Sequence, residues 1–287
     1  MIEDFFQSVL DEHLPTSQLI KHRSVGGGCI NNAVQLETDN GTYFIKWNHK
    51  SENDLFITEE KGLSILSEKS VLKIAEVLGG GIHQDKAYLL LEWMESGHAS
   101  SQFWDDFGSG LAELHRCSSD NFGLDHDNFI GRLPQSNTYH QTWSDFFIQE
   151  RLIPQLKLAS SKNLINEGIR SDFELLFPKL ENIVPKESPA LLHGDLWSGN
   201  FLTGEQSEPV LIDPAVHYGH RETELAFTQM FGGFDRKFYQ AYQAHFPLEQ
   251  GFEDRSEIHN LYPLLVHVNL FGSSYLGGVL QTLKRFI

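Results

Sequence analysis

The chain has 287 residues, of which 40% are hydrophobic, and a formal net charge of -17 at pH 7. This length and apolar content are enough for a sizeable core in one large domain or two lobes. The acidic charge would repel phosphate backbones, so we do not expect a nucleic-acid partner.

The sequence contains no expected export or membrane segment. The N-terminus has neither a basic region nor a long apolar run, so it does not predict a signal peptide. Residues 261–280 are strongly apolar but contain His267 and Asn269, which favours a buried helix over a membrane span. The two cysteines, Cys29 and Cys117, do not suggest a disulfide framework. We therefore expect a cytoplasmic protein without membrane partners.

The first third of the chain predicts a helix followed by strands. Apolar residues recur at helical spacing over residues 5–14 and predict a helix that ends before Pro15. Residues 24–47 predict a strand, a glycine loop, a second strand, a tight turn and a third strand. Two further strands are expected at residues 71–78 and 87–93, around the glycine cluster of residues 79–81.

The glycine loop is a candidate phosphate site. Gly26, Gly27 and Gly28 would let backbone N–H groups approach a phosphate closely, although three glycines also occur in flexible turns. The arrangement is not G-x-G-x-x-G. Cys29 in this loop is either an inert small residue or a thiol whose oxidation links two copies of an otherwise monomeric chain.

Lys46 is the candidate phosphate-binding cation. It follows an apolar strand, as the phosphate-pairing lysine of a kinase does, although an isolated lysine in that place could equally be solvated. The helix predicted next offers Glu59 or Glu60 as its partner. The helical phase favours Glu59, which lies three residues after Phe56 and four before Leu63.

The strand at residues 87–93 ends in a short polar and aromatic segment that is typical of a hinge between two lobes. Adenine at this hinge would be bound by backbone groups. We therefore place the lobe boundary near Met94. Residues 1–93 would form a nucleotide-binding lobe, and residues 94–287 a catalytic and substrate-binding lobe.

After this hinge the sequence predicts mainly helices. A loop is expected over residues 118–137 and a helix break at Pro154. The predicted helices cover residues 103–117, 143–158, 163–180, 222–247 and 256–285, with further breaks at residues 231–234 and 277–278. Strands first and helices later favour an α+β protein, with a small antiparallel sheet in one lobe and a larger, mainly helical second lobe.

The most informative stretch is residues 193–200, which read H-G-D-L-W-S-G-N. Asp213 follows Asn200 by thirteen residues, directly after a short apolar strand. A turn at residues 204–209 would bring Asp213 back beside residues 193–200. Phosphoryl transfer needs a carboxylate beside the attacking hydroxyl and oxygen ligands for Mg²⁺. The spacing therefore predicts a kinase site, with Asp195 beside the hydroxyl and Asn200 and Asp213 as metal ligands.

Four further residues are candidates for the substrate side. Trp197 lies inside the same loop and would either stack on a sugar or pack the core. His217, His220 and Arg221 follow Asp213 and would either line the substrate site or pack the loop. The chain has 14 histidines but no H-E-x-x-H motif or paired-cysteine pattern, so the sequence does not predict a transition-metal site.

These motifs resemble a known family. Residues 193–200 and 212–214 are similar to the aminoglycoside-phosphotransferase superfamily of small-molecule kinases. A longer pattern resembles the fructosamine/ketosamine kinase family and covers nearly the whole chain. It comprises residues 25–28, 30–31, 128–131, 135, 137, 212–222, 225–226 and 231–234. The resemblance implies a two-lobed, protein-kinase-like fold.

The resemblance also implies an activity and residue roles. Members would use ATP and Mg²⁺ to phosphorylate the sugar 3-hydroxyl of ribulosamines, erythrulosamines or fructosamines, a deglycation repair. Asp195 would be the base or would orient the hydroxyl, and Asn200 and Asp213 would hold Mg²⁺. Lys46 would pair with ATP phosphates, positioned by Glu59, and Glu92, Trp93 and Met94 would meet adenine. The alternatives are a kinase for an aminoglycoside-like or choline-like amine, and a non-catalytic binding protein.

Overall fold

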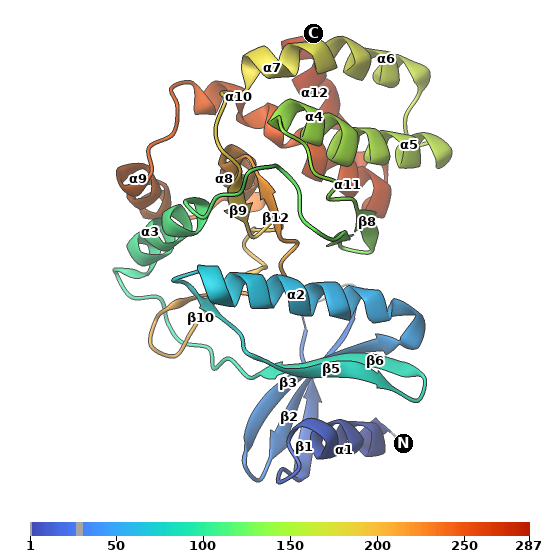
Figure 1. Ribbon diagram of the computed structural model, residues 1–287, viewed down its shortest axis with the longest axis vertical. Coiled ribbons are helices and arrows are strands. Elements are labelled where there is room, and N and C mark those ends of the chain that lie inside the picture. The colour runs from blue at the N-terminus through green and yellow to red at the C-terminus, as the bar shows by residue number, and fades with distance from the viewer. Residues whose placement is uncertain (1, 27–30) are drawn as a thin grey trace.

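The structure is a computed structural model that describes residues 2–26 and 31–287. The predictions for Gly27, Gly28 and Cys29 therefore lie outside the described residues. Figure 1 shows a twisted sheet between two helices at one end of the molecule and a mainly helical part at the other. This arrangement confirms the predicted α+β fold with a small antiparallel sheet and a larger helical lobe.

The sheet is antiparallel throughout, with strand order β1-β2-β3-β6-β5. Its strands are β1 (Leu19–Ser24), β2 (Asn32–Thr38), β3 (Gly41–His49), β5 (Val77–His83) and β6 (Lys86–Glu92). Successive side chains of a strand point to opposite faces. Tyr88 and Leu90 of β6 therefore pack toward α1 (Ile2–His13), and Leu89 and Leu91 toward α2 (Asn53–Lys69).

The predicted end of a strand at Leu78, before the glycines of residues 79–81, is wrong. These glycines lie inside β5, and the turn falls at Gln84, whose φ is 57°. The reason is the close approach of α1 to the strand. A Cβ at Gly79 would lie 2.2 Å from Nδ1 of His13, so only glycine fits beneath that imidazole.

A second, smaller sheet ties the two parts of the chain together. β10 (Phe201–Thr203) and β11 (Pro209–Leu211) form the predicted hairpin, and β11 also pairs in parallel with β4 (Lys73–Ile74). The segment before Asp213 is therefore bonded to the N-terminal third of the chain. The large sheet ends at Glu92 and the next helix begins at Phe103, so a lobe boundary near Met94 stays our proposal.

The helical part differs from the sequence prediction at three places. Pro154 does not break a helix, because it lies in the first turn of α5 (Ile153–Ser161), directly after a π-helical turn, where its missing N–H is tolerated. Gly277 and Gly278 lie inside α12 (Leu276–Phe286), and the break falls at Gly272, whose φ is 99°. The loop predicted at residues 118–137 contains a short hairpin of β7 (Asn128–Ile130) and β8 (Leu133–Gln135).

The remaining elements of the described chain follow in order. They are η1 (Lys50–Glu52), α3 (Phe103–His115), α4 (Trp143–Phe146), η2 (Phe147–Leu152), α5 (Ile153–Ser161), α6 (Glu167–Leu176), η3 (Phe177–Lys179), α7 (Leu180–Ile183), β9 (Ala190–Leu192), β12 (His217–Gly219), α8 (Arg221–Gln229), η4 (Met230–Gly232), α9 (Arg236–His245), α10 (Phe252–His259), α11 (Leu261–Phe271), η5 (Ser273–Tyr275) and α12 (Leu276–Phe286). Within residues 2–26 and 31–287, no helix is long and apolar enough to cross a membrane.

The packing of α3 against α9 gives a test of the fold. A Cβ at Gly108 in α3 would lie 2.2 Å from the carbonyl oxygen of Phe238, so we expect Gly108→Ala to lower the free energy of unfolding by about 1–3 kcal/mol in urea titrations. Gly277→Ala is the matched control, because its Cβ would meet no atom within 4 Å in α12. Alanine there should raise stability by up to about 1 kcal/mol. Equal effects of the two substitutions would contradict the packing.

Candidate active site

Asp195 and Asn200 lie on the loop that joins β9 to β10. Nδ2 of Asn200 donates to the backbone oxygen of Asp195 at 2.8 Å and to its Oδ2 at 2.9 Å. The Asn200 amide therefore fixes the direction of the carboxylate. Because its nitrogen is engaged, Oδ1 of Asn200 is the atom left to bind a metal. Burial raises the pKa of Asp195 well above its ordinary value, and the nearby Asp213 raises it further.

Lys46 of β3 joins three elements. Its Nζ lies 2.6 Å from Oε1 of Glu59 in α2 and also contacts Oδ1 of Asp213, which follows β11 in the chain. The contact with Glu59 is the one that the helical phase predicts, whereas Glu60 lies over Gly80 of β5. Burial lowers the pKa of Lys46, but Asp213 and Glu59 outweigh burial and hold that pKa above its ordinary value. Lys46 is therefore a fixed positive charge.

The backbone around Asp213 is held against residues 193–200, which we call the catalytic loop because it carries the candidate catalytic Asp195. Nε2 of His193 donates to the carbonyl oxygen of Ile212 at 2.8 Å, and the N–H of Ala215 donates back to the carbonyl oxygen of His193 at 2.8 Å. Asp213 itself has a φ of 55°, a left-handed conformation that aspartate tolerates better than most residues. Burial lowers the pKa of His193, so its imidazole is neutral and serves as a spacer between the two segments.

Asp213 and Asn200 suit a hard cation. A carboxylate oxygen and an amide oxygen are donors of the kind that Mg²⁺ takes in proteins. The side chain of Asp213 is 44% exposed, so a solvated ion can reach it. The two residues therefore fit the role that the sequence predicts, and metal binding there remains a proposal.

Glu224 of α8 is a site residue that sequence reasoning missed. Its Oε1 accepts the N–H of Gly194 at 2.7 Å, and its Oε2 accepts the N–H of His193 at 3.2 Å and Nε2 of His115 at 2.9 Å. Burial acts to raise the pKa of Glu224, but the hydrogen bond from His115 helps to hold the pKa below its ordinary value. This carboxylate anchors the start of the catalytic loop. The sequence around it gives only an ordinary amphipathic helix.

A cavity of about 40 Å³ opens beside Asp195. Its walls come mainly from η2, β12, α8 and α11 and mix apolar side chains such as Phe147, Phe227 and Val266 with polar ones. The polar side chains besides Asp195 include Arg151, His217, Thr223, Glu224, Tyr262 and His267. This mixture of apolar walls and a few convergent polar groups is typical of small-molecule sites. The cavity is therefore the candidate acceptor pocket.

Arg151 is the second site residue that the sequence did not reveal. It is 1% exposed and donates to the carbonyl oxygen of Ser136 at 2.6 Å and to Oδ1 of Asn137 at 2.7 Å. Its guanidinium lies over the ring of Phe146 at 4.5 Å, and its Nε has no hydrogen-bond partner in the structure. Burial lowers the pKa of Arg151 to about 10, which leaves it charged at neutral pH. The pocket therefore contains a buried cation.

The four predicted substrate-side residues divide into two pairs. Trp197 is 36% exposed on the catalytic loop, and His217 lines the cavity. His220 and Arg221 are buried elsewhere: Nε2 of His220 bonds to the carbonyl oxygen of Pro185, and Arg221 forms a two-pronged ion pair with Glu187 at 2.7 Å. His220 and Arg221 therefore secure the start of α8.

The predicted hinge residues lie at the end of β6, with Glu92 its last residue and Trp93 and Met94 directly after it. Oε1 of Glu92 accepts the N–H of Glu76 at 2.8 Å and lies 3.1 Å from Nζ of Lys73, so its side chain serves the structure. Trp93 packs near the ring of Phe44, and Met94 is half-buried. Gly26 is exposed just before the residues that the structure does not describe. Adenine binding at this hinge stays a prediction.

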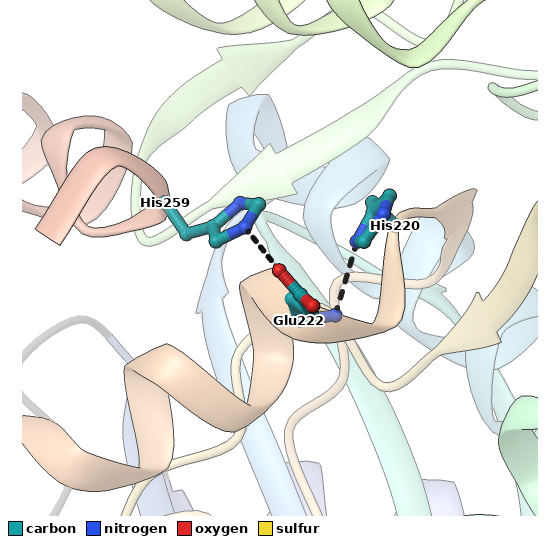
Figure 2. Close-up of side chains that lie close together, drawn as sticks. All are labelled: His220, Glu222 and His259. Carbon is teal, nitrogen blue, oxygen red and sulfur yellow. Dashed lines mark hydrogen bonds and ion pairs between the residues drawn. The ribbon is translucent and has the colours of Figure 1, made fainter. Parts of the chain in front are cut away.

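His220, Glu222 and His259 form a buried polar cluster at the start of α8 (Figure 2). Nε2 of His259 lies 3.1 Å from Oε2 of Glu222, and Nδ1 of His220 accepts the N–H of Glu222 at 3.3 Å. Arg255 occupies both carboxylate oxygens of Glu222 at 2.5 and 2.8 Å. Although three such ligand groups could hold a metal, they are already satisfied by one another and by Arg255. We therefore interpret the cluster as a structural anchor of α8.

These features together define a class of protein: a phosphotransferase with a protein-kinase-like fold. A choline kinase from Streptococcus pneumoniae shares this fold with a TM-score of 0.65, at 15% identity over 99% of both chains. The sequence model of the fructosamine kinase family matches residues 1–287. The chain belongs to the fructosamine kinase family.

Individual relatives agree with this assignment. An Enterococcus faecium protein named probable ketoamine kinase is 40% identical over 265 residues, which cover 91% of this chain and 94% of the relative. The chloroplastic protein-ribulosamine 3-kinase of Arabidopsis thaliana is 35% identical over 94% of this chain and 84% of its own length. A crystal structure of a fructosamine-3-kinase candidate from Haemophilus somnus has a TM-score of 0.88 and 27% identity, covering 98% of this chain and 96% of that one.

The buried cluster predicts a pH-dependent stability. Burial acts to raise the pKa of Glu222, but hydrogen bonds from Arg255 and His259 hold it at about 2, against an ordinary value of 4.5. Because the folded pKa is depressed, this stabilisation is complete above pH 4.5 and is lost as the pH falls toward 2. Glu222→Gln should cost about 3–5 kcal/mol at pH 7 in urea unfolding, since it leaves the buried guanidinium of Arg255 without its carboxylate partner. The deficit should shrink in acid, and a pH-independent deficit would contradict the interpretation.

The anchor at Glu224 predicts a kinetic effect. Glu224→Gln keeps the shape but gives one oxygen and one NH₂ group where two backbone N–H donors converge. We expect kcat to fall by about 10- to 100-fold, the cost of displacing a catalytic group slightly, while KM for ATP stays within a factor of about two. Steady-state kinetics would show this split, with exposed Glu113→Gln of α3 as the control. An equal loss in both variants would argue against the anchor.

Proposed function

We propose that this chain is an ATP-dependent kinase that phosphorylates the sugar 3-hydroxyl of a ketosamine, such as a ribulosamine. The observation that carries the proposal is the joint placement of Lys46, Asp195 and Asp213 in one site of a chain that belongs to the fructosamine kinase family throughout its length. The names of the relatives in Enterococcus and Arabidopsis support the substrate class.

The residues of the site have complementary tasks in this reaction. Asp195, aimed by the Asn200 amide, orients the acceptor hydroxyl and takes its proton as the new ester bond forms. Lys46, held by Glu59, neutralises the phosphate oxygens of ATP. The sugar would occupy the cavity beside Asp195, and Trp197 would cover the acceptor from the exposed side of the loop.

Asn200 and Asp213 would hold Mg²⁺. When bound, the ion would balance negative charge on the phosphates during transfer. The close contact between Lys46 and Asp213 places the two opposite charges of the proposed nucleotide site side by side. Glu92, Trp93 and Met94 would border the adenine.

The proposal is tested by coupled ATP-consumption assays with Mg²⁺ and a panel of acceptors. Lysine adducts of ribulose, erythrulose and fructose should be turned over, whereas kanamycin and choline should not. Asp195→Asn should lower kcat by about 10²- to 10⁴-fold with ATP affinity retained in calorimetry, because proton acceptance is lost but the nucleotide contacts are not.

Other outcomes would change the assignment. Turnover of kanamycin or choline alone would keep the phosphotransferase chemistry and discard the ketosamine. ATP binding without turnover of any acceptor would favour a non-catalytic binding protein. Full activity of Asp195→Asn would remove Asp195 from its proposed role.

A further inference from the structure

Phe231 combines an unfavourable backbone conformation with an exposed side chain. It lies in η4, the break between α8 and α9, with a φ of 53°, a left-handed value that is rare for bulky side chains. Its side chain is 46% exposed, whereas Phe234 of the same motif is 9% exposed and packs in the core. Strained conformations persist where the surroundings impose them, and they gather at functional sites. Core packing therefore accounts for Phe234 but not for Phe231.

Phe231 belongs to a group of aromatic side chains from three elements. Its ring centroid lies 4.8 Å from that of His267 in α11, which in turn lies 5.5 Å from Phe271 and 5.0 Å from Tyr275. Phe271 is 58% exposed. We call these four residues the aromatic cluster. Single exposed apolar residues are ordinary, but a contiguous exposed group of rings marks a contact site.

The aromatic cluster is continuous with the acceptor cavity. His267 belongs to both, because it lines the cavity that Asp195 also borders. Phe227 is a second wall residue of the cavity, and the ring of Phe231 lies 6.4 Å from it. The cluster and the cavity therefore share His267 and adjoin at Phe227, so a molecule whose hydroxyl reaches Asp195 could extend onto the cluster.

We propose that the aromatic cluster binds the amine-bearing part of the acceptor: the protonated secondary amine and the alkyl chain beyond it. This inference rests on the proposed ketosamine acceptor. In such a compound the phosphorylated carbon stands at Asp195, and the nitrogen lies two carbons further along the chain. When the amine belongs to a larger molecule, this part has to leave the cavity, and the cluster stands at its edge.

The chemistry of the cluster matches that group. Aromatic faces attract alkylammonium ions and pack well against methylene chains. Burial lowers the pKa of His267, and its Nδ1 lies 2.7 Å from the carbonyl oxygen of Pro263. The imidazole is therefore neutral at pH 7 and does not repel a cation. The net charge of -17 further favours a positively charged ligand.

The test compares two acceptors that share a sugar and differ in the amine: the ribulose adducts of methylamine and of Nα-acetyl-lysine. The variants are Phe231→Gly, which suits the left-handed backbone, and Phe271→Ala at the exposed end of α11. We expect the double variant to raise KM for the lysine adduct about tenfold, roughly threefold for each aromatic contact. KM for the methylamine adduct should rise less than about threefold, and kcat should be unchanged.

The matched control is Leu175→Ala in α6, which removes a side chain that is 59% exposed and lies outside the cluster. An equal rise in KM for both acceptors, no rise for either, or a fall in kcat alone would overturn the inference. A change of oligomeric state in light scattering would assign the cluster to contact between copies instead. Failure of the wild-type protein to use any ketosamine would be the separate failure of the proposed function, and the inference would fall with it.

Discussion

The ion-paired Lys46 is the contact on which the site depends. A buried ammonium group is stable only when opposite charges offset the loss of its hydration, and Glu59 and Asp213 supply them. These three residues come from a strand of the large sheet, from α2 and from the segment behind β11. The Lys46 ammonium thus brings a sheet, a helix and the second lobe to a common point. A nucleoside triphosphate bound there would have its phosphate charge balanced by Lys46.

On the side of the site that holds Asp195, the buried charge is an anion, Glu224, and hydrogen-bond donors offset the loss of its hydration. The catalytic loop offers two backbone N–H groups to Glu224, which is itself held by His115. α8, which carries Glu224, is fixed in turn by the ion pairs of Arg221 and of Glu222 at its start. Buried charges whose hydrogen bonds are all satisfied make the surrounding structure rigid. The position of Asp195 therefore depends on contacts well outside its own loop.

The sequence was sufficient for the fold class, the hairpin and the Lys46–Glu59 contact, because each follows from local spacing, whereas the catalytic role of residues 193–200 stays a prediction. It failed at residues 79–81, where the need for glycine at Gly79 comes from His13 on a distant helix. It also missed Glu224 and Arg151. Both are charged residues in ordinary helical patterns, and only the tertiary structure buries them beside Asp195. Spacing predicts groups that act within one loop, but not those that converge from separate elements.

The most direct test of the account is the position of the phosphate in the product. Purified protein would be incubated with ATP, Mg²⁺ and a ribulosamine, and the product examined by ³¹P and ¹³C NMR. The account predicts one phosphate ester, on the 3-hydroxyl of the sugar, formed in step with ATP consumption and absent with Asp195→Asn. A phosphate ester on another hydroxyl, or ATP hydrolysis without an ester, would contradict it.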